Sequence, residues 1–158
     1  MPPDFKYKRI ATGGTFDHIH RGHKELLKRA FDTGESIFIG LTSDEFAAKE
    51  GKKIEENFET RKRNLEEYLK SAYPGRNYEI SKLVDRFGPA IYSEKIDAIA
   101  VSAETFPAVE AANKKRRELG LHDLKVEVVP MKMADDGSKI SSTRIRVGEV
   151  DPDGKILK

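Results

Sequence analysis

Thr12-Gly13-Gly14-Thr15-Phe16-Asp17-His18-Ile19-His20-Arg21-Gly22-His23 is the stretch of sequence that decides the fold. Residues 5–11 precede it and alternate in polarity, which is typical of a strand. Residues 24–31 follow it, and their apolar side chains recur at positions that share one helical face. The sequence therefore predicts a strand, a glycine turn and a helix in succession.

Three glycines and two histidines give this stretch its predicted chemistry. Gly13 and Gly14 can take backbone angles that are closed to other residues, and they let a ligand approach the main chain. Gly22 stands at the start of the helix, where unpaired N–H groups and the helix dipole favour a phosphate. His20 and His23 flank it, and a histidine can donate a hydrogen bond to a phosphate oxygen at neutral pH. We therefore predict a phosphate-binding turn.

Simpler interpretations of the same residues stay open. The paired glycines also fit an ordinary turn. His18, His20 and His23 could be metal ligands, although the chain has no cysteine and no obvious fourth ligand stands nearby. Asp17 is compatible with a turn-forming role alone, and His18 with a structural or solvent-facing one.

The composition limits the classes of function. A chain of 158 residues has the length of one domain with a single core. Its 29 basic and 27 acidic residues leave a net charge of +2, which gives no general attraction to nucleic acid or membranes. The absence of cysteine excludes disulfides and thiolate metal sites and fits a reducing compartment. We find no signal sequence or membrane span, and we expect a cytoplasmic protein without nucleic-acid or membrane partners.

Strand and helix patterns alternate along the chain. Strands are predicted at residues 5–11, 36–41, 78–84, 96–101 and 125–129, and helices at 24–31, 46–48, 59–72, 106–119 and 141–147. This alternation is typical of an α/β protein with a Rossmann-like parallel sheet of five strands sandwiched by helices. We expect one domain over residues 1–148 and a polar tail over 149–158. Ligands of such sheets bind beyond the carboxyl ends of the strands.

A second motif lies far downstream, at Lys139-Ile140-Ser141-Ser142-Thr143-Arg144. It resembles the serine-rich motif that accompanies His-x-Gly-His in the nucleotidyltransferase superfamily, which includes the class I aminoacyl-tRNA synthetases. Residues 85–90 and 101–105 lie between the two motifs. Together with residues 13–17 they resemble the archaeal and eukaryotic type of phosphopantetheine adenylyltransferase, the penultimate enzyme of coenzyme A synthesis. The resemblance follows most of the chain in the same order.

The resemblance implies a reaction and assigns residues to it. The adenylyl group of ATP would pass to 4′-phosphopantetheine by in-line attack without a covalent intermediate, giving dephospho-coenzyme A and pyrophosphate. Thr15, His20 and His23 would be the catalytic residues. ATP would be bound by a larger set of glycines, hydroxyls and charged residues: Gly13, Gly14, Phe16, Gly22, Ser102, Glu104, Ile140, Ser141, Ser142, Thr143 and Arg144. Mg²⁺ would accompany the triphosphate, without a metal site built by the protein.

The residues that recognise the acceptor are harder to assign. Bacterial relatives place an arginine after the fourth strand, where this chain has Ser102. The acceptor phosphate must therefore meet other cations. The candidates are Lys52, Lys53, Arg61 and Arg86, and each of them could equally be an ordinary surface charge. Asn113 is a further possible contact by its position alone.

Several alternatives compete with this interpretation. Ser141 and Ser142 could simply cap a helix. The basic run 114–117 could bind nucleic acid, but its place inside a predicted helix favours a solvated surface. A sibling transferase would use nicotinamide mononucleotide or glycerol phosphate as its acceptor, and a regulatory module would bind nucleotide without catalysis. No Gly-x-x-x-x-Gly-Lys-Ser/Thr loop occurs, so we expect the chain to carry one activity only, without the kinase that is fused to the eukaryotic counterpart.

Overall fold

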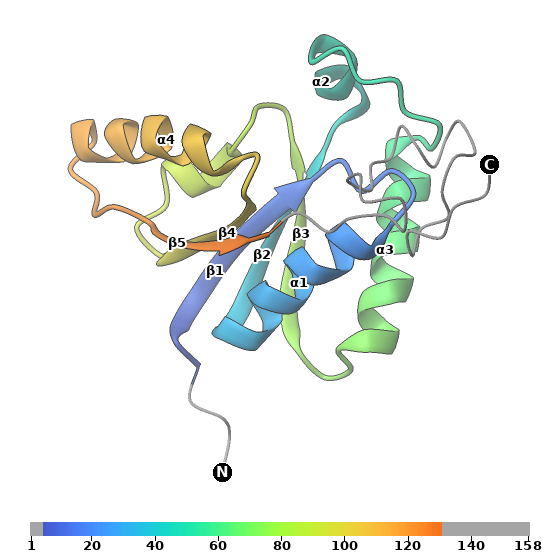
Figure 1. The fold of residues 1–158 in the computed structure, drawn as a ribbon, viewed down its shortest axis with the longest axis horizontal. Helices are drawn as coiled ribbons and strands as arrows, with labels where there is room; N and C mark the ends of the chain where they lie inside the picture. Colours follow the sequence, from blue (N-terminus) through green and yellow to red (C-terminus); the bar gives the residue numbers. More distant parts are fainter. Residues whose placement is uncertain (1–4, 131–158) are drawn as a thin grey trace.

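The computed structural model describes residues 5–130 (Figure 1). The predicted serine-rich motif, the helix at 141–147 and the polar tail lie outside the described residues. The described elements follow one another along the chain as β1 (Tyr7–Gly14), α1 (Arg21–Thr33), β2 (Gly34–Thr42), α2 (Asp44–Lys49), α3 (Phe58–Ala72), β3 (Asn77–Leu83), the 3₁₀ turn η1 (Gly88–Ile91), β4 (Ala98–Ser102), α4 (Phe106–Glu118) and β5 (Lys125–Val129).

The five strands form one parallel sheet in the order β3-β2-β1-β4-β5. The predicted α/β fold with a five-stranded parallel sheet is therefore confirmed, and β5 lies at an edge. The chain leaves β1 toward β2, whereas β4 lies on the other side of β1, so the strand order reverses between β1 and β4 (Figure 1). A crevice is expected at the carboxyl ends of the strands at such a reversal.

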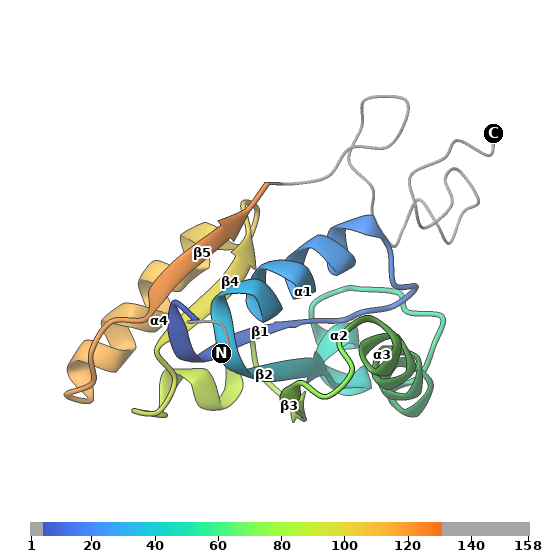
Figure 2. The same ribbon diagram turned by 90° about the horizontal axis from the view of Figure 1, so that it is seen from below.

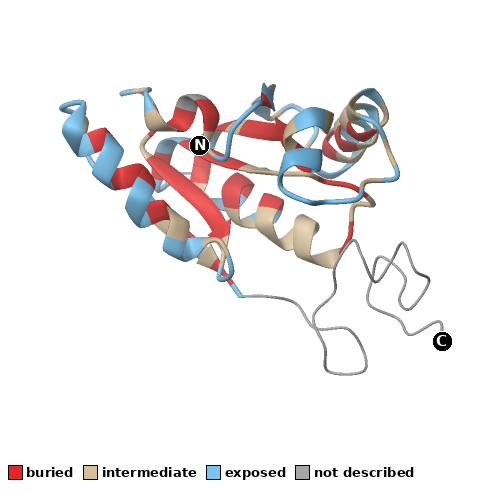
Figure 3. Ribbon diagram, turned by 90° about the horizontal axis from the view of Figure 1, so that it is seen from above, coloured by how far each residue is buried: buried red, intermediate tan, exposed pale blue. Residues whose placement is uncertain are grey.

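Both faces of the sheet are buried. Successive side chains of a strand point to opposite faces, so neighbouring residues of one strand join different apolar clusters. Ile10 of β1 joins one apolar cluster, which also contains Leu27 and Phe31 of α1 and Leu65 of α3. Ala11, the next residue, joins a second cluster with Val109 of α4 and residues near η1. Figures 2 and 3 show the layers from opposite directions, and Figure 3 shows burial concentrated in the strands and on the helix faces turned toward them. This burial explains the nearly continuous apolar runs in the sequences of β2 and β4.

The paired glycines end β1 rather than forming the predicted turn. Gly13 and Gly14 pair with Gly40 and Leu41 of β2 in regular parallel register. A Cβ on Gly13 would lie 2.8 Å from the carbonyl oxygen of Gly40, so close strand packing requires glycine there. The strand therefore runs three residues beyond the predicted end at residue 11, and the chain turns only after Gly14.

The turn itself uses residues other than glycine. Phe16 and His18 have φ angles of 52° and 54°, in the left-handed region that such residues seldom adopt. Asp17 stands between them and is completely buried. Backbone strain of this kind persists only where the surroundings fix it, and it clusters at functional sites.

Candidate active site

A cavity of about 690 Å³ opens at the carboxyl ends of the strands, within the size range of small-molecule sites. Its walls come from the end of β1, the start of α1, the region around α2, the segment after β3 and the turn between β4 and α4. The residues predicted for the site that line this cavity are Gly13, Gly14, Thr15, His20, Gly22, His23, Lys52, Arg86, Ser102 and Glu104. The structure therefore brings together residues that stand as much as 91 positions apart, counting from Gly13 to Glu104.

Four predicted residues within the described part of the chain do not line the cavity, namely Phe16, Lys53, Arg61 and Asn113. The side chain of Phe16 is completely buried in the apolar cluster beneath α1, and its ring centroid lies 5.0 Å from that of His23. Lys53 is exposed. Arg61 is completely buried. The predicted contacts at Ile140, Ser141, Ser142, Thr143 and Arg144 fall outside the described residues.

His20 and His23 cap the start of α1 reciprocally. Nδ1 of His20, the N-cap residue, accepts a hydrogen bond from the N–H of Gly22 at 3.0 Å, and the His20 side chain also accepts from the N–H of His23. Nδ1 of His23 accepts in return from the N–H of His20 at 3.2 Å. The two rings stack with centroids 3.8 Å apart. The helix start is thus closed by imidazoles in a pattern usually made by Ser or Thr with Glu.

This capping fixes where each neutral ring carries its proton. An imidazole nitrogen that accepts a hydrogen bond has no proton, so the single proton of the neutral ring lies on the other nitrogen. Since Nδ1 of both rings accepts from the backbone, both Nε2 atoms carry the proton. His20 and His23 both line the cavity, and each ring has one N–H donor of defined tautomer.

Both rings are neutral at physiological pH. Burial lowers the pKa of His20 to about 4. Burial also lowers the pKa of His23 well below its ordinary value, and the neighbouring His20 and Lys52 add to this effect. A neutral pair can stack without charge repulsion. The site therefore offers hydrogen-bond donors rather than a general base whose pKa lies near neutral pH.

Gly22 is required by the His20 ring. A Cβ at this position would lie 2.9 Å from Cε1 and 3.1 Å from Nδ1 of His20. A side chain there would displace the ring from the N–H that it accepts. The neighbouring ring therefore limits the space at Gly22.

Two cations border the cavity from separate segments. Lys52 places its Nζ 3.3 Å from Oγ1 of Thr15. Arg86 follows β3 and forms an ion pair of 3.7 Å with Glu50. Both basic groups lie beside a cavity that also holds the histidine donors, so an anion such as a phosphate matches this wall of the site.

The turn between β4 and α4 forms another part of the cavity wall. Ser102 Oγ lies 3.2 Å from Thr105 Oγ1 and accepts from the N–H of Thr105 at 3.3 Å. Ser102, Glu104 and Thr105 all line the cavity. Asn113 has a structural role instead, because its buried amide bonds both the N–H and the carbonyl of Leu124.

The basic run at residues 114–117 does not present one charged face. Arg116 is completely buried and donates to the carbonyls of Ala90, Ser93 and His122. Arg117 forms a two-pronged ion pair with Asp123. The structure therefore gives the nucleic-acid interpretation no continuous basic surface at this run.

The metal-ligand interpretation of the histidines also finds no support. Within residues 5–130, no group of three or more His, Cys, Asp or Glu side chains could hold a metal ion. Nδ1 of His20 and of His23 is already occupied by backbone N–H groups. In the same part of the chain, no helix has the length and apolar character needed to cross a membrane.

The sequence analysis did not predict the contacts of Asp17, and it made Arg61 a candidate contact of the acceptor phosphate. Asp17 lies at the cavity wall, and its carboxylate accepts from the N–H groups of Glu55 and Glu56. Arg61 donates to protein carbonyls and a carboxylate rather than facing the cavity, so its geometry does not favour the predicted contact with the acceptor. A signal was present: Arg61 precedes Leu65 and Leu69 at four-residue spacing, on the buried face of α3.

Residues 11–148 match the model of the cytidylyltransferase-like family. Curated relatives named phosphopantetheine adenylyltransferase include a protein of Methanothermobacter thermautotrophicus, 47% identical over 97% of this chain and 92% of the relative. Another, from Pyrococcus furiosus, is 41% identical over 97% of this chain and 96% of the relative.

Solved structures agree on the fold. A protein of unknown function from Archaeoglobus fulgidus has a TM-score of 0.70 and 32% identity, with 77% of this chain and 88% of that chain covered. The tyrosyl-tRNA synthetase of the same organism has a TM-score of 0.64 at 15% identity, with 88% of this chain and 60% of that chain covered. At this low identity the second likeness concerns the fold alone.

Proposed function

The chain belongs to the cytidylyltransferase-like family, and from this premise we infer that it is a phosphopantetheine adenylyltransferase. It transfers the adenylyl group of ATP to 4′-phosphopantetheine and releases dephospho-coenzyme A and pyrophosphate. The observation that carries this conclusion is the identity of 40–47% to relatives of that name over almost the whole chain. The donors that line the cavity supply the chemistry that this transfer needs.

The acceptor in this reaction needs no general base. A phosphate monoester has its second pKa near 6 and is mostly dianionic at pH 7. One of its oxygens attacks the α-phosphorus of ATP, and the bond from that phosphorus to the bridging oxygen breaks as pyrophosphate leaves with the electron pair. A pair of neutral histidines that cannot take up a proton near pH 7 is consistent with this chemistry.

The barrier is electrostatic, because two anions approach and negative charge spreads over the α-phosphate. Donors fixed where that charge develops provide the largest single term in many enzymes, and removal of one typically costs about 3–4 kcal/mol. We assign this role to the Nε2–H groups of His20 and His23 and to the hydroxyl of Thr15. Their positions on the cavity wall and their fixed tautomers support the assignment.

The triphosphate and its metal complete the proposal. Ile140, Ser141, Ser142, Thr143 and Arg144 would hold the β- and γ-phosphates, as the resemblance implies. Mg²⁺ would enter with ATP, since the described site offers no cluster of carboxylates for it. Among the carboxylates at the cavity, Asp17 is bonded to backbone N–H groups and Glu50 to Arg86. We expect the metal to be bound mainly by phosphate oxygens and water.

Acceptor recognition falls to the two cations at the cavity wall. We propose that Lys52 and Arg86 bind the phosphate of 4′-phosphopantetheine, because both line the cavity that also holds Thr15 and the histidines. The near-balanced net charge of +2 fits small-molecule substrates without nucleic acid. We further propose the cytoplasm as the compartment, as expected for a cysteine-free chain that uses ATP.

The test is pyrophosphate release from ATP with purified protein and a panel of phosphorylated acceptors. We expect turnover with 4′-phosphopantetheine and none with nicotinamide mononucleotide or glycerol phosphate. Turnover with one of the latter alone would identify a sibling transferase. Tight ATP binding without turnover on any acceptor would identify a regulatory module and refute the proposal.

A further inference from the structure

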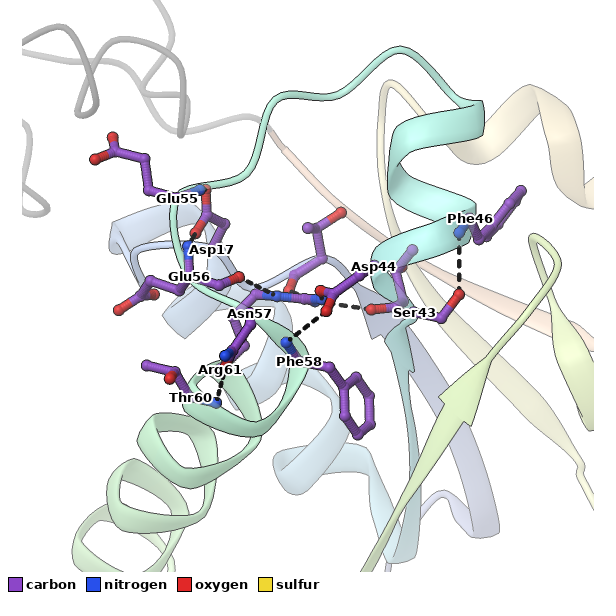
Figure 4. A network of polar contacts seen from close by, with 12 residues as sticks. Asp17, Ser43, Asp44, Phe46, Glu55, Glu56, Asn57, Phe58, Thr60 and Arg61 are labelled. Atoms are coloured by element: carbon purple, nitrogen blue, oxygen red, sulfur yellow. Dashed lines mark hydrogen bonds and ion pairs between the residues drawn. The ribbon is translucent and has the colours of Figure 1, made fainter.

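A completely buried arginine joins three segments behind the active site. Arg61, in the first turn of α3, donates from Nε to the carbonyl of Glu56 at 2.9 Å. Its Nη1 donates to the carbonyls of Thr15 and Thr42, both at 2.8 Å. Its Nη2 forms an ion pair of 2.6 Å with Asp44 (Figure 4). The guanidinium thus connects the turn after β1, the end of β2 and the segment before α3.

Asp17 also connects two of these segments, the turn after β1 and the segment before α3. Its carboxylate oxygens accept from the N–H groups of Glu55 and Glu56 at 3.2 and 3.1 Å. In turn, the side chain of Glu56 accepts a hydrogen bond from the N–H of His18 at 3.0 Å. We call residues 50–57 the strap. The turn after β1 and the strap are therefore bonded to each other in both directions, over a turn that contains two strained residues.

The strap carries Lys52 to the cavity. Lys52 stands only three positions before Glu55, and its Nζ lies 3.3 Å from the hydroxyl of Thr15. The two residues are 37 positions apart in the sequence, so their proximity depends on how the strap is held against the turn. A hydroxyl and an ammonium group at this distance could contact the same phosphate.

We propose that Arg61 and Asp17 are positioning residues that align Lys52 with Thr15 for adenylyl transfer. The proposal rests on the proposed function and deepens it, because the residues act through groups that would contact the phosphates. Neither side chain needs to touch a substrate. Arg61 is buried and uses four of its five N–H donors on the protein, three on carbonyls and one on Asp44.

Arg61→Lys is the central test, with Arg76→Lys as its matched control. Lysine retains the charge but cannot reach three carbonyls in the planar arrangement of a guanidinium. Arg76 also donates to two carbonyls, those of Phe31 and Gly34, but at the opposite end of the sheet. We expect Arg61→Lys to lower kcat/KM about 30-fold, in line with the cost of misplaced catalytic groups. Arg76→Lys should lower the Tm while leaving kcat/KM within about twofold, because it touches only the scaffold.

A double-mutant cycle with Lys52→Ala separates positioning from general stabilisation. If Arg61 acts through Lys52, Arg61→Lys should have a several-fold smaller effect in the Lys52→Ala background than in the wild type. Fully independent effects of the two substitutions would overturn the proposal. So would an Arg61→Lys protein that loses stability like Arg76→Lys but retains its kcat/KM.

Hydrogen exchange supplies a readout that does not depend on activity. Asp17→Asn removes the charge that accepts from two strap amides, so the amides of Glu55 and Glu56 should exchange faster while those of β1 and β2 keep their protection. Unchanged exchange in the strap would contradict the role of Asp17. If the wild-type protein transferred no adenylyl group, the proposed function would fail. The exchange experiment would still show whether Asp17 holds the strap against the turn after β1.

Discussion

The starts of α1 and α4 border the same cavity, yet they are built in opposite ways. Both follow neighbouring parallel strands, β1 and β4, at the carboxyl ends of these strands. The N-cap of α1, His20, has an extended backbone and a side chain that bonds the helix N–H groups. The N-cap of α4, Thr105, has a helical backbone and makes no side-chain cap, and Pro107 follows in its first turn.

This difference indicates how the two sides divide the work. At α1, the N–H groups of Gly22 and His23 are used by the His20 ring, so a phosphate would meet imidazole N–H donors rather than those two backbone amides. Rings fixed by reciprocal bonds suit charge that develops at a defined point. At α4, the loosely bonded hydroxyls of Ser102 and Thr105 suit recognition of a bound group. We therefore expect losses in kcat from changes at α1 and losses in affinity from changes at α4.

The largest effect should come from His23→Ala. This change removes one N–H donor and also the acceptor for the N–H of His20. We expect kcat to fall by about 100- to 1000-fold, the usual cost of losing a donor to developing charge, with a change in KM for ATP of less than about threefold. Steady-state kinetics of pyrophosphate release measures both constants.

His122→Ala is the control for this prediction. His122 is exposed, stands between α4 and β5 and does not line the cavity. Its replacement should leave both kinetic constants unchanged. If His23→Ala raised KM and left kcat intact, the ring would be a binding group and the contrast between the two helix starts would fail.

Gly22→Ala should have the next largest effect. The added methyl group would lie 2.9 Å from Cε1 of His20, so the ring must move and its bond to the Gly22 N–H must weaken. We expect kcat to fall about tenfold, since small displacements of catalytic groups are costly. The same substitution in a His20→Ala background should cost little more. An equal loss in both backgrounds would show that the methyl group obstructs the substrate instead of the ring.

The buried histidines also predict how stability depends on pH. An unfolded histidine takes up its proton near pH 6.5, but the pKa of folded His20 is about 4. Between these values the unfolded chain binds more protons, so the free energy of unfolding falls as the pH falls. From pH 7 to pH 5 this amounts to about 2 kcal/mol for one such group. Denaturant titrations should show the loss in the wild type and a smaller one in His20→Gln.

The sheet was predictable from sequence because apolar runs and alternating polarity both report burial. The five strands and the helices around them follow from that pattern, within a few residues at each end. The end of β1 was missed, because glycine weakens a strand and usually marks a turn. Only the neighbouring carbonyl of Gly40 explains why Gly13 belongs to the ladder, and that contact comes from a different strand.

The sequence identified many of the residues that line the cavity, but not the contacts that support them. The two histidines and Gly22 were identified from their spacing, but histidine is not among the usual N-cap residues, so their reciprocal capping was not expected. Arg61 was predicted to bind the acceptor phosphate or to be a surface charge, and Arg116 to lie on a solvated surface, because arginine is seldom buried. Each is instead bonded to several carbonyls from distant segments, which sequence order does not reveal.

The smallest effect should come from Ser102→Ala at the start of α4. The change removes an oxygen that accepts from the Thr105 N–H at 3.3 Å and meets the Thr105 hydroxyl at 3.2 Å. We expect the Ser102 hydroxyl to bond ATP as well, and since one hydrogen bond contributes about 0.5–1.5 kcal/mol, KM for ATP should rise about threefold while kcat stays the same. Ser36→Ala, in the amino-terminal half of β2, is the matched control. A fall in kcat without a change in KM would place part of the chemistry at α4 and remove the division between the two helix starts.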